Sequence, residues 1–170
     1  MTNKSFSPIP QYAFRVITDI TTDFLKQLGV KFLILDLDNT IAAYNEQKLA
    51  DSIVLWIKTI QNSGIVIFII SNSNRKKRVE DFSGSIGAGY IKQAGKPSPK
   101  NVHRAMEKTG FSSDETALAG DQIFTDTLAA NRAGVISIIV PPRRYTNPLF
   151  ALRYGIEAPF RALCRNKLKN

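Results

Sequence analysis

The sequence predicts an α/β fold with a mostly parallel sheet, because short apolar runs alternate with segments whose apolar residues recur at helical spacing. Residues 32–36 and 65–70 are the clearest runs, and their near-continuous apolar content is typical of strands buried on both faces of a sheet. With 170 residues and 44% hydrophobic composition, the chain can bury one sizeable core. We therefore expect a single domain over residues 1–170.

The first part of the chain predicts a helix, a strand, a helix and a strand. Residues 20–28 are expected to form a helix that Gly29 ends before the strand at 32–36. The next helix carries its apolar residues at helical spacing: Leu49, Ile53, Trp56, Ile57 and Ile60. This spacing makes Trp56 a core residue, and the strand at 65–70 follows.

The same alternation continues to the end of the predicted sheet. A basic helix is expected from Asn74, and a helix over residues 98–109 has Pro99 in its first turn, where a missing N–H does no harm. The remaining predicted elements are a strand at 89–92, a strand at 116–119, a helix at 124–133 and a strand at 135–140. Pro141-Pro142 then breaks the pattern.

Two segments lie outside this alternation: a helical lead-in at residues 1–30 and a basic C-terminal segment at residues 141–170. The net charge is +9, from 23 basic and 14 acidic residues, and the C-terminal segment holds seven basic residues against one acidic residue. A basic segment that also carries aromatic and aliphatic residues can lie on an anionic membrane or bind nucleic acid. The alternative is a pair of amphipathic helices packed on the core, with a solvated basic face.

Compartment signals are few. The N-terminus lacks the apolar stretch of a signal peptide, and the longest apolar run, at 65–70, is too short to span a bilayer. A single cysteine, Cys164, excludes an internal disulfide framework and fits a reducing compartment. We expect a cytoplasmic protein that is soluble or attached peripherally to the inner face of the membrane.

Polar side chains follow four of the predicted strands, at the edge where an open α/β sheet gathers its binding residues. They are Asp36 and Asp38, Ser71 and Asn72, Lys96, and Asp121 with Asp126. Such groups suit phosphoryl transfer, because carboxylates hold Mg²⁺, the metal and a lysine neutralise the phosphoryl oxygens, and a free carboxylate can attack in line. We therefore expect a phosphorylated substrate and Mg²⁺ as cofactor.

Other common motifs do not account for these residues. A calcium loop beginning at Asp36 would need glycine at its sixth position and glutamate at its twelfth, where the chain has Ile41 and Gln47. No Gly-x-x-x-x-Gly-Lys-Ser/Thr loop occurs, which excludes a P-loop nucleotide hydrolase. Taken singly, Ser71 could cap a helix and Lys96 could be a surface lysine, but their order and their place at strand ends favour a shared site.

The motifs together resemble those of the haloacid dehalogenase (HAD) superfamily of phosphatases. Asp36-Leu-Asp-Asn-Thr40 matches the first motif, Ser71 the second, Lys96 the third and Gly120-Asp-Gln-Ile-Phe-Thr-Asp126 the fourth, in the right order. With Asn131-Arg-Ala-Gly134, they look like the YqeG-type phosphatases of subfamily IIIA, whose mitochondrial relatives hydrolyse phosphatidylglycerophosphate. The resemblance implies a HAD-type, Rossmann-like three-layer sandwich.

The resemblance also implies a role for each polar residue. Asp36 would be the nucleophile that forms an aspartyl-phosphate, and Asp38 would be the general acid and base. Mg²⁺ would be held by Asp36, the main-chain carbonyl of Asp38, and Asp121, with Asp126 orienting Asp121 or Lys96. The phosphoryl oxygens would be held by the Ser71 hydroxyl, the Asn72 amide and Lys96.

The spacing of the motifs leaves no room for a cap domain. Ser71 follows Asp36 by 35 positions and Lys96 follows Ser71 by 25, and one helix and one strand use each interval. Without a lid, specificity must come from the substrate or from a docking surface, which favours a protein, a nucleic-acid end or a lipid head group. Arg75 and Arg78 could guide a polyanion at the rim of the pocket, or they could form a solvated helix face.

The expected substrate is therefore an anionic lipid phosphate at a membrane surface, with phosphatidylglycerophosphate as the candidate that the resemblance supplies. One alternative is a phosphatase of a soluble sugar or nucleotide phosphate. A second is a basic nucleic-acid-associated protein with an incidental HAD core, and nucleic acid is the partner we expect least. The sequence leaves the oligomeric state open.

Overall fold

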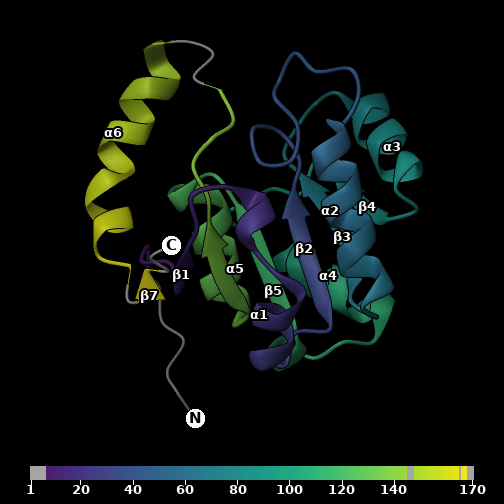
Figure 1. Cartoon of the computed structure of the whole chain (residues 1–170). Helices are drawn as coiled ribbons and strands as arrows, with labels where there is room; N and C mark the ends of the chain where they lie inside the picture. Colours follow the sequence, from purple (N-terminus) through teal and green to yellow (C-terminus); the bar gives the residue numbers. More distant parts are fainter. Residues whose placement is uncertain (1–6, 145–147, 165, 168–170) are drawn as a thin grey trace.

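The computed structural model of the chain describes residues 7–144, 148–164 and 166–167. Within these residues, seven strands form one sheet in the order β4-β3-β2-β5-β6-β1-β7, and all neighbouring strands run parallel (Figure 1). The predicted α/β fold with a parallel sheet is thus confirmed. Residues 145–147, 165 and 168–170 of the predicted basic segment lie outside the described residues.

The strands are β1 (Tyr12–Ala13), β2 (Phe32–Asp36), β3 (Val66–Ser71), β4 (Gly89–Lys92), β5 (Thr116–Gly120), β6 (Ile136–Ile139) and β7 (Asn166–Lys167). The α-helices are α1 (Thr22–Gln27), α2 (Asp51–Asn62), α3 (Lys76–Ser85), α4 (Lys100–Thr109), α5 (Leu128–Ala133) and α6 (Pro148–Ala162). Short 3-10 helices cover Ile17–Asp19 and Ser113–Glu115, and a single π-helical turn covers Ile123–Thr127.

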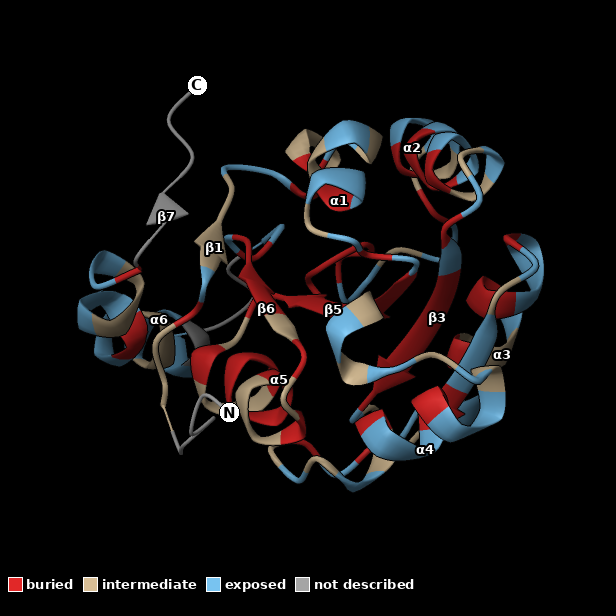
Figure 2. Ribbon diagram, turned by 90° about the horizontal axis from the view of Figure 1, so that it is seen from below, coloured by how far each residue is buried: buried red, intermediate tan, exposed pale blue. Residues whose placement is uncertain are grey.

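Helices cover both faces of the sheet and give three layers (Figure 2). Because side chains alternate along a strand, Leu33 and Leu35 of β2 join one apolar cluster with α1, α2 and α3. Phe32 and Ile34 join a second cluster with α4 and α5 on the opposite face. Trp56 lies buried in the first cluster, where its Nε1 donates to a main-chain carbonyl at 2.8 Å, so its predicted core role is confirmed.

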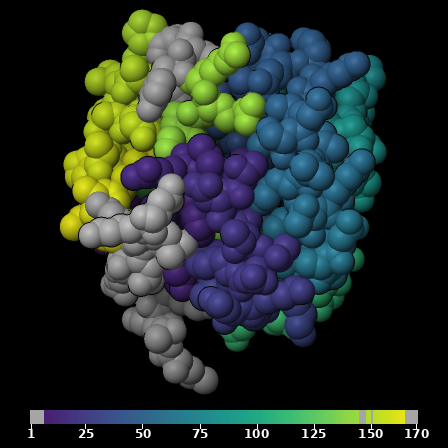
Figure 3. Space-filling view, in the orientation of Figure 1, coloured from purple at the N-terminus to yellow at the C-terminus, as the bar shows by residue number. Residues whose placement is uncertain are grey.

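Three features differ from the prediction. Strands β1 and β7 extend the sheet beyond β6 but contain two residues each, too few to show a strand period in the sequence. The predicted helix at 124–133 is a π-helical turn followed by α5. Instead of a pair of C-terminal helices, the described residues contain one, α6, which forms one flank of the molecule in Figure 3.

No cap domain interrupts the described core. Between Asp36 and Lys96, where every residue is described, the only regular elements are α2, β3, α3 and β4. The predicted absence of a cap is therefore confirmed for this interval. None of the helices in the described residues has the length and apolar content needed to cross a bilayer.

Candidate active site

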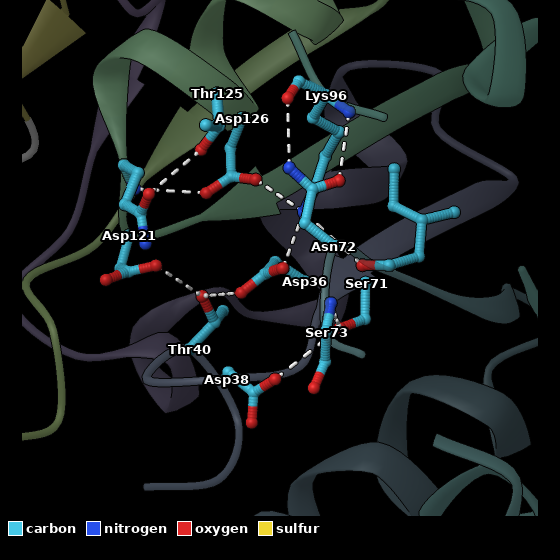
Figure 4. Close-up of polar contacts among 12 residues, drawn as sticks. Asp36, Asp38, Thr40, Ser71, Asn72, Ser73, Lys96, Asp121, Thr125 and Asp126 are labelled. Carbon is cyan, nitrogen blue, oxygen red and sulfur yellow. Dashed lines mark hydrogen bonds and ion pairs between the residues drawn. The ribbon is translucent and has the colours of Figure 1, made fainter. Parts of the chain in front are cut away.

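Asp36, the last residue of β2, lies at the centre of the polar cluster (Figure 4). The Nζ of Lys96 is 2.5 Å from one Asp36 oxygen and 2.6 Å from an oxygen of Asp126. All three side chains are buried, and the ammonium also lies 3.4 Å from the main-chain oxygen of Ile70. A single cation is therefore shared by two carboxylates inside the protein.

Thr40 connects Asp36 to the third carboxylate. Its hydroxyl is 3.0 Å from the second oxygen of Asp36 and 3.3 Å from an oxygen of Asp121, within hydrogen-bond distance of both. The chain returns Thr40 to this position through a tight turn in which Asn39 adopts a left-handed conformation, with φ of 65°. Asn is among the few residues that tolerate this conformation, so this turn fits the sequence.

Three carboxylates, from Asp36, Asp121 and Asp126, bring oxygens within 4.8 Å of one another. One oxygen of Asp121 is buried and has no hydrogen-bond partner among the described residues. Buried carboxylate oxygens need a partner, and clustered oxygens are the donors that Mg²⁺ prefers. The residues present therefore fit a hard divalent cation, and they bring Asp126, which the sequence placed behind the metal ligands, into the same cluster.

Two acids of this cluster, Asp36 and Asp121, are difficult to ionise. Burial raises the pKa of Asp36 to about 7, with further increases from the nearby Asp126 and Asp38, while Lys96 opposes the rise. Burial, Asp36 and Asp126 likewise raise the pKa of Asp121 well above its usual range, against the attraction of Lys96 and Arg161. Burial disfavours the charge of Lys96, but Asp126 and Asp36 outweigh it and raise the lysine pKa. With all three acids ionised, the cluster would have more negative charge than Lys96 alone can neutralise.

The carboxylate of Asp38 points away from this cluster. One oxygen is 3.1 Å from Nε of Arg78, and the other is 3.5 Å from the hydroxyl of Ser71. Arg78 also donates to the main-chain oxygens of Ala43, at 2.8 Å, and of Glu46. Its side chain is only 9% exposed, so Arg78 does not stand at an open rim as the sequence suggested: its long side chain reaches inward to Asp38 and the following loop.

Arg75, the other predicted rim residue, is exposed and lies beside the pocket. Its guanidinium stacks over the ring of Tyr44, 4.2 Å from the ring centre, and donates to the main-chain oxygen of Tyr44 at 2.9 Å. Because Tyr44 lines the pocket, Arg75 supports one wall of the opening.

Ser71 is the last residue of β3 and Asn72 follows it, on the side of β2 opposite β5. The Asn72 side chain donates to the main-chain oxygen of Lys96 and accepts from its main-chain N–H, both at 2.9 Å. The Ser71 hydroxyl accepts from the N–H of Ser73 at 3.0 Å. The two residues therefore fix the loops that carry the hydroxyl and the ammonium to the pocket.

These side chains border an open cavity of about 270 Å³. Its lining consists of Asp36, Asp38, Tyr44, Ser71, Asn72, Ser73, Asn74, Lys96, Gln122 and Thr125. The sequence carries no signal for Tyr44 and Asn74, which lack a motif of their own, whereas Ser73 lies in the Ser71-Asn-Ser73 motif and Gln122 and Thr125 lie inside the motif that ends at Asp126. A larger hollow beside the amino ends of β3 and β4 contains no carboxylate and cannot provide this chemistry.

The family model for the haloacid dehalogenase-like hydrolases matches residues 12–134. "Probable phosphatase YqeG" of Bacillus subtilis (strain 168) is 34% identical over 161 residues, covering 95% of this chain and 92% of the relative. "Phosphatidylglycerophosphate phosphatase 1, chloroplastic/mitochondrial" of Arabidopsis thaliana is 22% identical over 161 residues, covering 85% of this chain but only 44% of that longer protein.

Among solved structures, a 3-deoxy-D-manno-octulosonate 8-phosphate phosphatase from Moraxella catarrhalis, in complex with magnesium and phosphate, has a TM-score of 0.50. It is 15% identical, covering 81% of this chain and 92% of that one, and it shows likeness of fold. The family match covers the elements that carry the polar cluster, and the relative from Bacillus subtilis aligns along nearly the whole chain. The chain therefore belongs to the haloacid dehalogenase-like hydrolases and is a phosphatase of the YqeG type.

Proposed function

We propose that the chain hydrolyses phosphate monoesters through an aspartyl-phosphate on Asp36, with Mg²⁺ as cofactor. The observation that carries this proposal is the sharing of Lys96 by Asp36 and Asp126, next to the unpartnered oxygen of Asp121. In this arrangement an Asp36 oxygen, which can receive a phosphoryl group, lies beside the Lys96 ammonium, which can neutralise the phosphoryl oxygens. Such an arrangement serves transfer chemistry rather than stability, since buried charges that lack partners are costly.

The reaction has two steps. An Asp36 oxygen forms a bond to phosphorus as the ester P–O bond breaks, and Asp38 gives its proton to the departing alkoxide. Asp38 then takes a proton from water, whose oxygen attacks phosphorus and releases inorganic phosphate with Asp36 regenerated. The Ser71 hydroxyl, the Asn72 amide and Lys96 stabilise the phosphoryl oxygens as charge redistributes.

Mg²⁺ would be held by Asp36, Asp121 and the main-chain carbonyl of Asp38. Asp126, beside Lys96, would orient Asp121 or Lys96. When bound, the cation would neutralise negative charge of the three carboxylates and would favour the ionised form of Asp36. Because burial raises the pKa of Asp36 to about 7, only part of the protein would carry ionised Asp36 at neutral pH without the cation. The attack on phosphorus needs the ionised carboxylate.

We further propose that the substrate is a lipid phosphate at an anionic membrane surface. The pocket has no cap, α6 exposes Leu149, Leu152 and Ile156, and Leu163 directly follows the helix; each is at least half exposed. Arg153 on the same helix is partly exposed and lies 3.5 Å from Glu157, and the exposed Arg144 comes shortly before the helix in the sequence; basic and apolar side chains together suit anionic lipid head groups. The Arabidopsis relative, whose name specifies phosphatidylglycerophosphate, supports this substrate class.

The test compares phosphate release from phosphatidylglycerophosphate in vesicles with release from a chromogenic phosphate, a sugar phosphate and a nucleotide, all with Mg²⁺. The proposal predicts faster turnover of the lipid, and loss of all activity in Asp36→Asn. Faster turnover of a soluble sugar or nucleotide phosphate would instead favour a soluble substrate. RNA binding with a steep salt dependence, together with no Mg²⁺-dependent phosphatase activity, would favour the nucleic-acid alternative.

Docking of the exposed apolar residues of α6 on a membrane can be tested with a matched control variant. Replacing Leu152 and Ile156 with serine should weaken binding to anionic vesicles, while Leu55→Ser on α2, where the leucine is 68% exposed on another face, should not. Turnover of the chromogenic phosphate should be unchanged in both variants. Equal vesicle binding by all three proteins would contradict docking through α6.

A further inference from the structure

Helix α6 lies outside the segment that matches the family model, yet it contacts the loop that carries two of the clustered carboxylates. We infer that Glu157 and Arg161 of α6 are positioning residues that hold Asp121 and Asp126 in the arrangement that binds the divalent cation. This inference rests on the metal site of the proposed function, but it concerns a different part of the chain and has its own test.

The orientation of α6 is the first reason. Three of its large apolar side chains, Leu149, Leu152 and Ile156, face solvent. Among the side chains described in the helix, Glu157 is the one that is buried, at 1% exposed. A glutamate is rarely fully buried unless it is paired, because burial of a charge costs free energy. A helix that turns a charged residue inward is therefore held by specific polar contacts.

Glu157 contacts the start of the π-helical turn. One of its oxygens accepts the main-chain N–H of Phe124 at 3.2 Å, and the other accepts from Arg161 at 2.9 Å. The ring of Phe160, also on α6, packs edge-on against the ring of Phe124, with centres 5.4 Å apart. The turn that carries Asp126 is thus attached to α6 by both a charged hydrogen bond and an aromatic contact.

Arg161 contacts the preceding residues of the same loop. Its guanidinium donates to the main-chain oxygen of Asp121 and, at 3.3 Å, to that of Val140, which directly follows β6. It also stacks over the ring of Tyr154, 4.4 Å from the ring centre, which fixes the orientation of its planar group. Arg161 therefore links Asp121 to the end of the next strand and, through Glu157, to the π-helical turn.

This loop needs such support because its acidic groups repel one another. Asp36, Asp121 and Asp126 lie within a few ångströms of one another around one lysine. The loop is also tightly packed, since a Cβ at Gly120 would lie 2.3 Å from the carboxyl carbon of Asp126. The Asp126 carboxylate occupies that space and accepts the N–H of Gln122 at 3.0 Å, so small loop movements would displace it.

The test measures Mg²⁺ affinity by calorimetry on purified protein without substrate, alongside amide hydrogen exchange at Phe124. Arg161→Gln should weaken Mg²⁺ binding by about 10-fold or more, the range for groups that orient metal ligands, and should speed exchange at Phe124. Glu157→Gln should have a smaller effect because its amide oxygen can still accept that N–H. Arg161→Lys should recover part of the loss, because it restores the charge beside Glu157.

The controls remove the same charges from exposed positions on α4, in Arg104→Gln and Glu107→Gln, and should leave both readouts unchanged. In turnover assays, Arg161→Gln should need more Mg²⁺ for half-maximal activity, with a smaller change in kcat at saturating Mg²⁺. Wild-type affinity in a folded Arg161→Gln protein would overturn the positioning role. Absence of Mg²⁺ binding by the wild-type protein would instead overturn the metal site itself, and the positioning role with it.

Discussion

Asp36→Asn is expected to stabilise the metal-free protein at pH 8 while abolishing its activity. In the folded protein, burial and the neighbouring carboxylates raise the pKa of Asp36 from 3.8 to about 7. The folded state therefore binds a proton more tightly than the unfolded chain, and stability falls as the pH rises from about 4 through about 7. Asparagine has the same shape and does not ionise, so it avoids this loss.

The magnitude follows from the size of the shift. About three pKa units at 1.36 kcal/mol each give roughly 4 kcal/mol as the upper limit for the cost of ionising Asp36 without metal. Asparagine loses the charge-assisted contact with Lys96, which offsets part of this amount. We therefore expect the free energy of unfolding to rise by about 2–4 kcal/mol at pH 8 in Asp36→Asn. At pH 5 folded Asp36 is mostly protonated, so the gain should fall to less than half.

Urea unfolding in the presence of a chelator measures this difference directly, at pH 8 and again at pH 5. Asp81→Asn on α3, which removes an exposed carboxylate paired with Lys77, is the matched control and should change stability little at either pH. A wild-type protein more stable than Asp36→Asn at pH 8, or a stability difference that does not vary with pH, would refute the reasoning. Added Mg²⁺ should stabilise the wild-type protein more than the variant, because it removes the same unfavourable charge.

Two further predictions concern the acid that faces away from the cluster. Asp38→Asn should lower kcat by about 10²–10⁴-fold, the usual contribution of a general acid and base, with little change in Mg²⁺ affinity measured by calorimetry; a large loss of Mg²⁺ binding would show that the Asp38 carboxylate acts at the metal instead. Arg78→Gln should lower kcat more than it raises KM for a chromogenic phosphate, because Arg78 holds Asp38 and the loop at Ala43 and Glu46. A rise in KM for polyanionic substrates alone would restore the interpretation of Arg78 as a rim residue.

The part of the site built on the central strands could be predicted from the sequence. Residues 32–36 form a short apolar run that ends in a carboxylate, and a buried parallel strand places that residue at the open edge of the sheet. The structure brings Lys96 and Asp121 to the same edge, as the order of the motifs indicated. Local patterns sufficed here because each residue lies directly after a strand or in its following loop.

The contacts made by long side chains could not be predicted in this way. In the basic run at 75–78, Lys76 and Lys77 face solvent and Arg78 turns inward, and a helical spacing alone does not say which cation finds a buried partner. For the basic C-terminal segment, the sequence left open whether it lies on a membrane or nucleic acid or forms a pair of amphipathic helices packed on the core. The structure instead turns Glu157 inward, onto Phe124 and Arg161. The sequence could not predict this, because Phe124 lies far along the chain and the contact with Arg161 depends on how the helix docks.

The central claim is that Asp36 accepts the phosphoryl group, and acid quenching during turnover with Mg²⁺ tests it most directly. Mass spectrometry of the quenched protein should find one phosphoryl group on the peptide that contains Asp36, and the adduct should be absent from Asp36→Asn and from a sample quenched without substrate. A phosphoryl group on another residue, or rapid hydrolysis with no protein adduct at any quench time, would contradict the account.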